Sequence, residues 1–173
     1  VENHDTQPGQ SLASTIESWF KPSAYALILL REAGTPCVFW GDLFGTPETG
    51  DLPAVTEVPL LMTMRRALAH GPQHDALDDP DVVGFTREGD DAHPGSGLAV
   101  VLSDRRAGTK RLHVGAGHAG EQWICVLGGH EPVTIGGDGS VDLPVSDGGL
   151  SIYAPETAKP ILDSAEQHLL RQR

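Results

Sequence analysis

Apolar residues in the first part of the chain recur at helical spacing. Tyr25, Leu29 and Leu30 fall on one face of a helix. Ser18 stands just before this stretch and is a candidate N-cap. Pro22 would fall in the first turn, where proline is tolerated because its missing N–H has no partner there. We therefore predict an amphipathic helix that begins near Ser18.

A short apolar run without polar alternation follows this helix. The run is Cys37-Val38-Phe39-Trp40, and successive bulky residues are typical of a strand buried on both faces. We expect this strand to lie in a core and Asp42, just after it, to fix the following loop as a hydrogen-bond acceptor. Residues 55–70 predict a second helix, whose apolar face holds Leu60, Leu61, Met64 and Leu68. Helix, buried strand and helix are the parts of β/α units.

The pattern changes after Gly71. Short apolar stretches separated by glycine, aspartate and proline indicate antiparallel strands of a sandwich or barrel. The predicted strands cover residues 82–87, 97–103, 109–114, 121–126, 133–135, 140–143 and 149–154. The tail from Glu156 is amphipathic, which leaves a short helix or disorder open. The chain therefore divides into a β/α part and an all-β part.

The composition and net charge of the chain limit the kinds of molecule that it is expected to bind. The chain has 173 residues, 39% of them hydrophobic, and a formal net charge of −12. This acidic balance disfavours nucleic acid and anionic membranes, since both attract basic patches. The sequence has no run of apolar residues long enough for a transmembrane helix. A neutral polymer is compatible with this charge.

The two cysteines and the first residue add little. Cys37 and Cys125 do not form a metal motif, which needs clustered ligands, and a disulfide between them stays open. The sequence begins at Val1 with neither methionine nor a signal peptide, inside what reads as a strand. We expect the natural beginning of the domain to lie upstream. The sequence therefore leaves localisation undetermined between cytoplasmic and secreted.

A compact polar cluster follows the first residues. Asn3, His4 and Asp5 stand where the apolar lead-in ends. Such a cluster is expected where a barrel strand runs into a loop, and catalytic groups of (β/α)8 barrels lie at these strand ends. The three residues alone are a weak signal, and a purely structural loop is the alternative.

The neighbouring residues give this cluster a context. The segment Asn3-His4-Asp5-Thr6-Gln7-Pro8-Gly9-Gln10-Ser11-Leu12 is followed by Trp19-Phe20-Lys21-Pro22, Ala24-Tyr25-Ala26 and Gly41-Asp42. This order and spacing resembles the α-amylases of glycoside hydrolase family 13, of the bacterial liquefying and fungal intracellular type. The resemblance returns at residues 83–89 and 150–153 and covers nearly the whole chain except the tail.

The resemblance implies a multi-domain fold. It consists of the last two β/α units of a (β/α)8 TIM barrel, followed by an all-β antiparallel, Greek-key domain C. Residues 1–75 would be the C-terminal remainder of the catalytic barrel, with residues 37–40 as its eighth strand. Residues 76–155 would form domain C, and residues 156–173 a polar tail.

The resemblance also implies an activity, the endo-hydrolysis of α-1,4-glucosidic bonds in starch or glycogen with retention. Retention needs a nucleophilic carboxylate and an acid/base carboxyl about 5 Å apart. Asp5 matches a third carboxylate of the family, which favours the oxocarbenium-like transition state. His4 matches the histidine that hydrogen-bonds the same sugar, and Asn3 and Gln7 are candidate substrate contacts. The nucleophile and the acid belong to barrel strands absent from this sequence, so we expect the fragment alone to be inactive.

The resemblance implies a second site, for calcium. Asp81 and Asp104 match carboxylates that hold a calcium ion between the barrel and domain C in some of these amylases. Pro80 replaces the usual histidine, which leaves the site intact if only its carbonyl oxygen binds. Aspartate also favours turns through its own hydrogen bonds, so a structural role for both residues stays open.

Two hypotheses of different class follow. In the first, the chain is part of an α-amylase whose substrate is an α-glucan. In the second, it is a non-catalytic C-terminal module that binds glucan or calcium. Neither hypothesis includes nucleic acid or a membrane as a partner. The sequence leaves the oligomeric state open, with a monomer as the default expectation.

Overall fold

The computed structural model describes residues 1–46 and 52–170. Three helices come first along the chain, α1 (Lys21–Leu30), α2 (Trp40–Phe44) and α3 (Val58–Ala67). A run of strands follows, and α4 (Lys159–Leu170) ends the described part. The strands are β1 (Gln73–Ala76), β2 (Val82–Arg87), β3 (Leu98–Ser103), β4 (Gly108–His113), β5 (Gln122–Leu127), β6 (Val133–Thr134), β7 (Ser140–Val145) and β8 (Leu150–Pro155).

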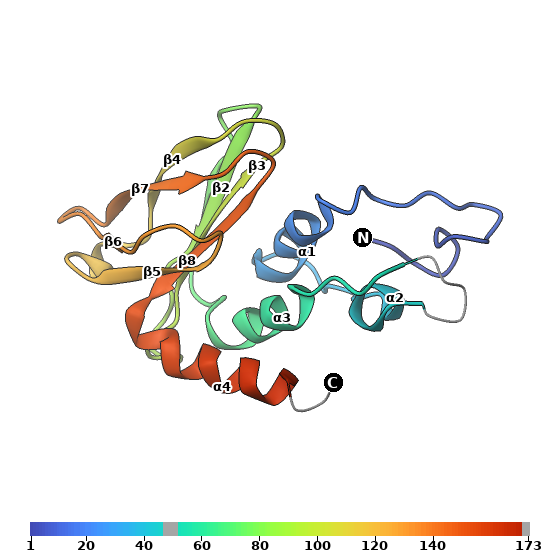
Figure 1. The fold of residues 1–173 in the computed structure, drawn as a ribbon. Coiled ribbons are helices and arrows are strands. Elements are labelled where there is room, and N and C mark those ends of the chain that lie inside the picture. The colour runs from blue at the N-terminus through green and yellow to red at the C-terminus, as the bar shows by residue number, and fades with distance from the viewer. Residues whose placement is uncertain (47–51, 171–173) are drawn as a thin grey trace.

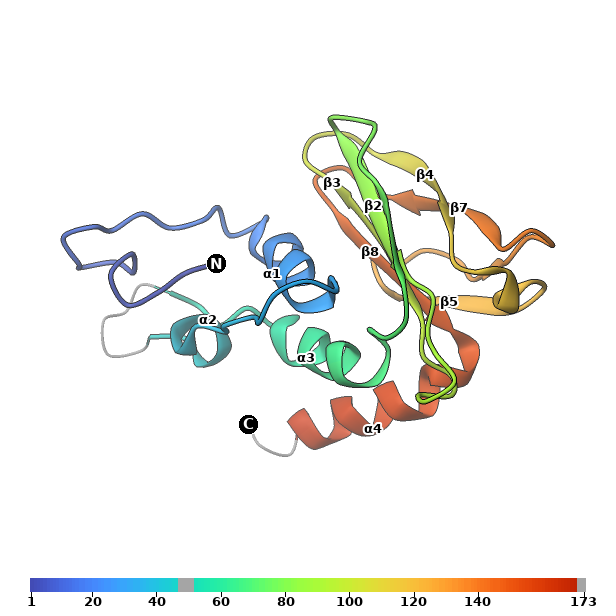
Figure 2. The same ribbon diagram turned by 180° about the vertical axis from the view of Figure 1, so that it is seen from behind.

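The strands form two antiparallel sheets. Six of them lie in the order β1-β2-β3-β8-β5-β6, and β4 pairs with β7 in a second sheet. β8 comes last in sequence but lies in the middle of the large sheet, where Val100 of β3 faces Ile152 of β8. The two-stranded sheet packs on one face of the large sheet, and α1, α3 and α4 lie on the side of the other face, with α2 farther from the strands (Figures 1 and 2).

The central strands are buried because both of their faces are covered. All six residues of β3 are buried. Leu98, Val100 and Leu102 point to the core beneath the helices, while Ala99 and Val101 point to the core between the two sheets. Successive side chains of a strand point to opposite faces, so one apolar run serves both cores. The core under the helices also contains Tyr25, Leu61, Met64, Phe85 and Ile152.

The predicted all-β part is confirmed. Each of the seven predicted strands forms, with ends that differ from the prediction by no more than about two residues, the usual uncertainty of such boundaries. β1 was not predicted, because Gln73, His74 and Asp75 carry no apolar alternation. As the edge strand of the large sheet, β1 needs no apolar face.

The predicted strand at residues 37–40 is wrong. Residues 35–39 have no regular structure, and Trp40 begins α2. Cys37 is exposed, and Trp40 is 70% exposed, so neither residue lies in the expected core. An apolar run indicates burial only when partners exist, and a strand needs neighbours for its N–H and C=O groups. No strand is described in residues 1–46 and 52–72, so the two barrel strands implied at Val1 and at 37–40 are not formed.

The helix predictions are confirmed with shifted ends. α1 begins at Lys21 after Phe20, without a side-chain cap, so the predicted capping by Ser18 is wrong. Pro22 lies in the first turn, as expected. α3 begins at Val58, later than predicted. The amphipathic tail forms α4, which buries Leu162, and residues 171–173 of the predicted tail lie outside the described residues.

Both cysteines are free thiols in the structure. Within the described ranges, every helix is too short or too polar to cross a bilayer.

Candidate functional site

The polar cluster near the N-terminus forms a tight turn. The side-chain oxygen of Asn3 accepts hydrogen bonds from the backbone N–H of Asp5 at 2.8 Å and of Thr6 at 3.1 Å. The backbone oxygen of Asn3 accepts from the N–H of Gln7 at 3.2 Å. Asn3 therefore shapes the loop from within, which is the typical use of an asparagine side chain in a turn.

This turn presents His4 and Asp5 to the surface. The side chain of His4 is 84% exposed and that of Asp5 is 60% exposed. Nε2 of His4 lies 3.4 Å from Oδ1 of Asp5, so the two predicted site residues are neighbours. Because the Asp5 carboxylate is accessible and the backbone beneath it is held, it is available to an external ligand.

A buried polar network anchors the turn from below. Glu2, Lys21 and Asp42 are almost fully buried. Nζ of Lys21 lies 2.7 Å from Oδ1 of Asp42 and 3.4 Å from Oε1 of Glu2. The hydroxyl of Tyr25 donates to Oδ2 of Asp42 at 2.6 Å. The expected role of Asp42 as a hydrogen-bond acceptor is thus confirmed, and its partners tie α1 to α2.

Glu2 connects this network to the loop. Its carboxylate accepts a hydrogen bond from the backbone N–H of Ile16 at 2.7 Å and from the hydroxyl of Thr6 at 3.1 Å. The hydroxyl oxygen of Thr6 also accepts a hydrogen bond from the backbone N–H of Asn3 at 3.1 Å. Both ends of the loop that carries Asp5 are therefore attached to one buried carboxylate.

Burial sets the protonation of Tyr25 in this network. Desolvation, followed by the hydrogen bond to Asp42, raises the pKa of Tyr25 well above its usual range, so the phenol stays protonated and keeps donating. The single ammonium of Lys21 stands between two buried carboxylates. Buried charges persist only when they are paired in this way.

Sequence reasoning missed Glu2 and Lys21. One signal was available for Lys21, which is the first residue of α1 and has no acidic neighbour in the first turn. A cation at a helix N-terminus is unfavourable because the helix dipole is positive there. Such a lysine indicates an anionic partner from elsewhere in the fold. Nothing local to Glu2 gives a comparable signal.

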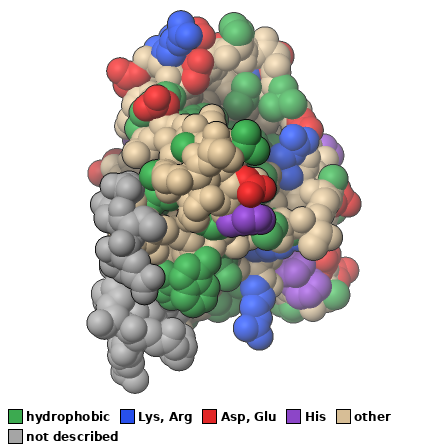
Figure 3. All heavy atoms as spheres, turned by 90° about the vertical axis from the view of Figure 1, so that its right-hand side faces the viewer, with side chains coloured by type: hydrophobic (Ala, Val, Ile, Leu, Met, Phe, Trp, Pro, Cys, Tyr) green, Lys and Arg blue, Asp and Glu red, His purple; other side chains and the backbone are tan. Residues whose placement is uncertain are grey.

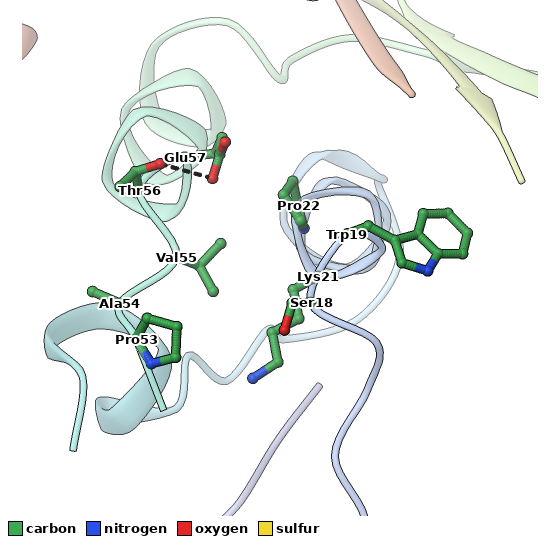
Figure 4. Close-up of a pocket in the computed structure, with 9 residues that line it drawn as sticks. All are labelled: Ser18, Trp19, Lys21, Pro22, Pro53, Ala54, Val55, Thr56 and Glu57. Carbon is green, nitrogen blue, oxygen red and sulfur yellow. Dashed lines mark hydrogen bonds between the residues drawn. The ribbon is translucent and has the colours of Figure 1, made fainter. Parts of the chain in front are cut away.

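A cleft of about 300 Å³ opens beside this network, between the start of α1 and the segment before α3. Lys21, Pro22, Pro53 and Val55 are among the residues that line it (Figure 4). The ring of Trp19 points away from the segment 53–57 in this view. His4 and Asp5 do not line the cleft, so it is separate from the predicted sugar contacts.

Exposed aromatic rings mark the surface near α2. Trp40 and Phe44 are 70% and 57% exposed, and their ring centroids lie 4.2 Å apart. Hydrophobic side chains gather in a compact patch on the face seen in Figure 3. Paired exposed rings of this kind are a common mark of an interaction surface.

The two predicted calcium ligands are joined through their backbones, and one of them, Asp81, already pairs with a cation. The backbone N–H of Asp104 donates to the backbone oxygen of Asp81 at 3.2 Å. Nε of Arg106 lies 2.9 Å from Oδ2 of Asp81, and its Nη2 lies 2.9 Å from Oδ2 of Asp79. Calcium needs six to eight oxygen ligands. With a guanidinium on these carboxylates, the described residues do not fit a calcium ion as they are arranged.

Hydrogen bonds shift the titration of this acidic loop. Backbone N–H groups of Asp81 and Val82 donate to Asp79 and, together with Arg106, hold its pKa below the usual range. The carboxylates of Asp81 and Asp79 raise the pKa of Arg106. The loop therefore contains its own charge compensation.

None of the protein-family models that were compared matches this chain. Curated relatives do match. The chain is 47% identical over 157 residues to the α-amylase of Bacillus licheniformis, across 88% of this chain and 31% of the relative. It is 44% identical over 156 residues to the α-amylase of Geobacillus stearothermophilus, across 90% of this chain and 28% of the relative. The chain is a homologue of the C-terminal part of the α-amylases. It spans about a third of the length of these relatives.

Solved structures support the fold. A crystal structure of AmyP in complex with maltose matches 90% of this chain and 40% of that chain, with a TM-score of 0.57 and 17% identity. An α-amylase from Malbranchea cinnamomea matches 79% of this chain and 33% of its own, with a TM-score of 0.56 and 15% identity. At this identity, the similarity bears on the fold alone. The sheet-rich antiparallel region thus resembles the corresponding region of α-amylases.

Proposed function

We propose that this chain is the C-terminal third of an α-amylase that cleaves internal α-1,4-glucosidic bonds of starch or glycogen with retention. The proposal is supported by the identity to named α-amylases over nearly the whole chain and by the small share of those relatives that the chain covers. The division into residues 1–75, 76–155 and 156–173 is part of this proposal. The nucleophile and the acid then belong to preceding parts of the enzyme.

Asp5 carries the chemistry that this chain supplies. Its carboxylate is fixed negative charge at the edge of the glucan site, and it opposes the positive charge that develops on the sugar ring in the transition state. His4, beside it, hydrogen-bonds the same sugar, and Gln7 contacts the glucan from the same turn. Asn3 positions the site indirectly, because its side chain holds the backbone of Asp5 and Thr6 by hydrogen bonds.

The single observation that carries this assignment is the attachment of the loop. An accessible carboxylate on a turn is ordinary, but this turn is fixed at Glu2 and Thr6 to a buried network of charges. Electrostatic catalysis needs groups that are held in place before the reaction starts. The Glu2–Lys21–Asp42 network supplies that rigidity under Asp5.

The activity is tested on the complete enzyme with soluble starch. Endo-cleavage should lower the viscosity well before reducing ends accumulate, because each internal cut shortens a long chain greatly but creates only one new reducing end. Retention should give products that are first released as the α-anomer, which proton magnetic resonance detects. Slow loss of viscosity, or first products of the β-anomer, would contradict the proposal.

The exposed rings of Trp40 and Phe44 support the barrel part of the proposal. In a complete barrel, the segment 35–44 gains neighbours that the described residues do not provide. A preceding part of the protein would then cover the apolar side chains that are exposed here.

If calcium binds at Asp81 and Asp104, it must compete with Arg106 for the Asp81 carboxylate. A backbone hydrogen bond joins the two aspartates, so both lie at the same end of β2 and β3. The guanidinium of Arg106 provides the positive charge in the present arrangement. Calcium would have to displace it and find further oxygen ligands outside the described residues.

The second candidate function is a non-catalytic, glucan-binding module. The exposed Trp40–Phe44 pair favours it, because aromatic faces provide an apolar platform for a sugar ring. A starch-binding assay on the chain produced alone distinguishes the glucan-binding module from the fragment of an enzyme. Glucan binding that Trp40→Ala abolishes would support the module, whereas a chain that neither binds nor cleaves starch supports the fragment of an enzyme.

A further inference from the structure

Two histidines and a glutamate meet where the two sheets come together. His74 lies on β1, Glu88 follows directly after β2, and His113 is the last residue of β4. Nε2 of His74 lies 2.6 Å from Oε1 of Glu88, and Nδ1 of His113 lies 3.6 Å from the same oxygen. The three ligand atoms all lie within 4.8 Å of one another.

The backbone around this cluster is held in place. β1 pairs with β2 so that His74 faces Thr86, and the hydroxyl of Thr86 donates to the backbone oxygen of His113 at 2.8 Å. Gly115 leaves room for Glu88, since a Cβ built there would lie 3.2 Å from the carboxyl carbon of Glu88. Three separate segments therefore deliver their side chains to one point.

The orientation of the rings suits a shared ion. The imidazoles of His74 and His113 are nearly perpendicular, at 83°, with centroids 5.8 Å apart. A metal ion must lie in the plane of each imidazole that binds it, and two perpendicular planes meet along a line. Zinc ligands at about 2.1 Å in a tetrahedron are separated by about 3.4 Å. Oε1 of Glu88 lies 3.6 Å from Nδ1 of His113, close to this spacing, and 2.6 Å from Nε2 of His74, a hydrogen bond that a bound ion would replace.

A second cluster lacks this property. His70, Asp90 and His93 also bring three ligand atoms within 4.8 Å. The rings of His70 and His93 are stacked, with centroids 3.5 Å apart and planes 7° from parallel. Parallel planes at that separation cannot share one ion. In addition, Nε2 of His70 contacts the backbone oxygen of Arg66 at 2.9 Å.

We propose that His74, Glu88 and His113 form a binding site for a divalent transition metal of the zinc type, with the fourth position open to solvent. Two imidazoles and a carboxylate are ligands that zinc prefers, whereas calcium prefers oxygen alone. The site is distinct from Asp81 and Asp104 in both position and ligand type. A bound ion links β1 and β2 of the large sheet to β4 of the small sheet, and so acts as a clamp between the two layers.

Zinc titration of the purified, metal-stripped protein tests this site at pH 7.5. Isothermal calorimetry with zinc chloride alone should give one tight site, and the melting temperature should rise with zinc, because only the folded state brings the three ligands together. His113→Gln should weaken binding at least about tenfold, the loss that even an outer-shell change causes. Calcium chloride should not compete for the site.

The stacked cluster provides the matched control. His93→Gln removes a histidine of similar exposure and should leave the zinc affinity unchanged. Cys37→Ser removes an exposed thiol, a further side chain that zinc can bind, and should also change nothing. His74→Gln, on an edge strand, repeats the test if His113→Gln disturbs the fold by circular dichroism. Equal binding in wild type and both glutamine variants of the site, or a loss confined to His93→Gln or Cys37→Ser, would overturn the proposal.

Discussion

Lys21 and Asp42 form a buried ion pair, with 2.7 Å between Nζ and Oδ1, that joins the first turn of α1 to α2. Both side chains are almost completely shielded from solvent, and Glu2 adds a second carboxylate to the same ammonium. This pair bears on the proposed function because Glu2 also holds the loop that presents Asp5.

Removing the ammonium should destabilise the protein strongly. Lys21→Met leaves the buried carboxylates of Glu2 and Asp42 without a cation, and breaking a buried pair in this way costs about 3–5 kcal/mol. Urea unfolding of the two proteins measures the change. Arg111→Met is the control, because it removes a surface partner of Asp142 and should cost less than about 1 kcal/mol. Equal effects of the two substitutions would show that the buried network is not needed for stability.

Replacing Asp5 should affect turnover more than substrate affinity. Asp5→Asn in the complete enzyme keeps the size of the side chain but removes the charge that acts on the transition state. We expect kcat on soluble starch to fall by roughly a hundredfold or more, the scale of losing one preorganised electrostatic group, with a far smaller change in KM.

Two further variants serve as a comparison and a control for Asp5→Asn. His4→Ala should cost less than Asp5→Asn, because it removes hydrogen bonds but no countercharge. Asp91→Asn changes an exposed aspartate away from the loop and should keep wild-type kinetics. Near-normal turnover of Asp5→Asn would return the loop to a purely structural role.

Arg106 and calcium should compete for the same carboxylates. Arg106→Gln frees Asp79 and Asp81, so calcium chloride should raise the melting temperature of this variant more than that of the wild type, through binding to the folded state. Adding Asp104→Asn to the variant should reduce the gain. An identical response to calcium in wild type, Arg106→Gln and the double variant would exclude a calcium site at these residues.

The acidic loop should contribute stability that is lost in acid. Folding lowers the pKa of Asp79 from its ordinary value of 3.8, chiefly through the backbone N–H of Asp81. A carboxylate with a lowered pKa stabilises the fold above its unfolded pKa, and this contribution disappears as the pH falls through the lowered value. Asp79→Asn should therefore be less stable than wild type at neutral pH, and the difference should shrink below about pH 3.8.

Urea unfolding at neutral pH and near pH 3 checks this dependence. Asp91→Asn serves again as the control and should differ little from wild type at either pH. A difference between Asp79→Asn and wild type that stays the same at both values would mean that the charge of Asp79 plays no part.

The all-β region could be predicted from the sequence because its signals are local. Most strands from β2 to β8 are short stretches with apolar residues between turn residues, although β4 (Gly108–His113) has Leu112 as its one bulky apolar side chain. Pairing between the strands satisfies their backbone N–H and C=O groups. The resemblance to the family likewise rests on short local motifs, those at residues 3–12, 19–26, 41–42, 83–89 and 150–153, whose order can be read without a structure. The accessibility of Asp5 and His4 follows from the same polar turn.

Tertiary structure decided what depends on partners distant in the sequence. The apolar run at 37–40 reads as a buried strand, yet no described strand pairs with it, so Trp40 turns outward and starts a helix. Glu2 and Lys21 are ordinary charged residues in the sequence, and only folding brings them to Asp42. The same holds for His74, Glu88 and His113, which come from three separate segments. Side-chain type is fixed by the sequence, but burial and ligand geometry arise only when separate segments pack, because they are properties of pairs and not of single residues.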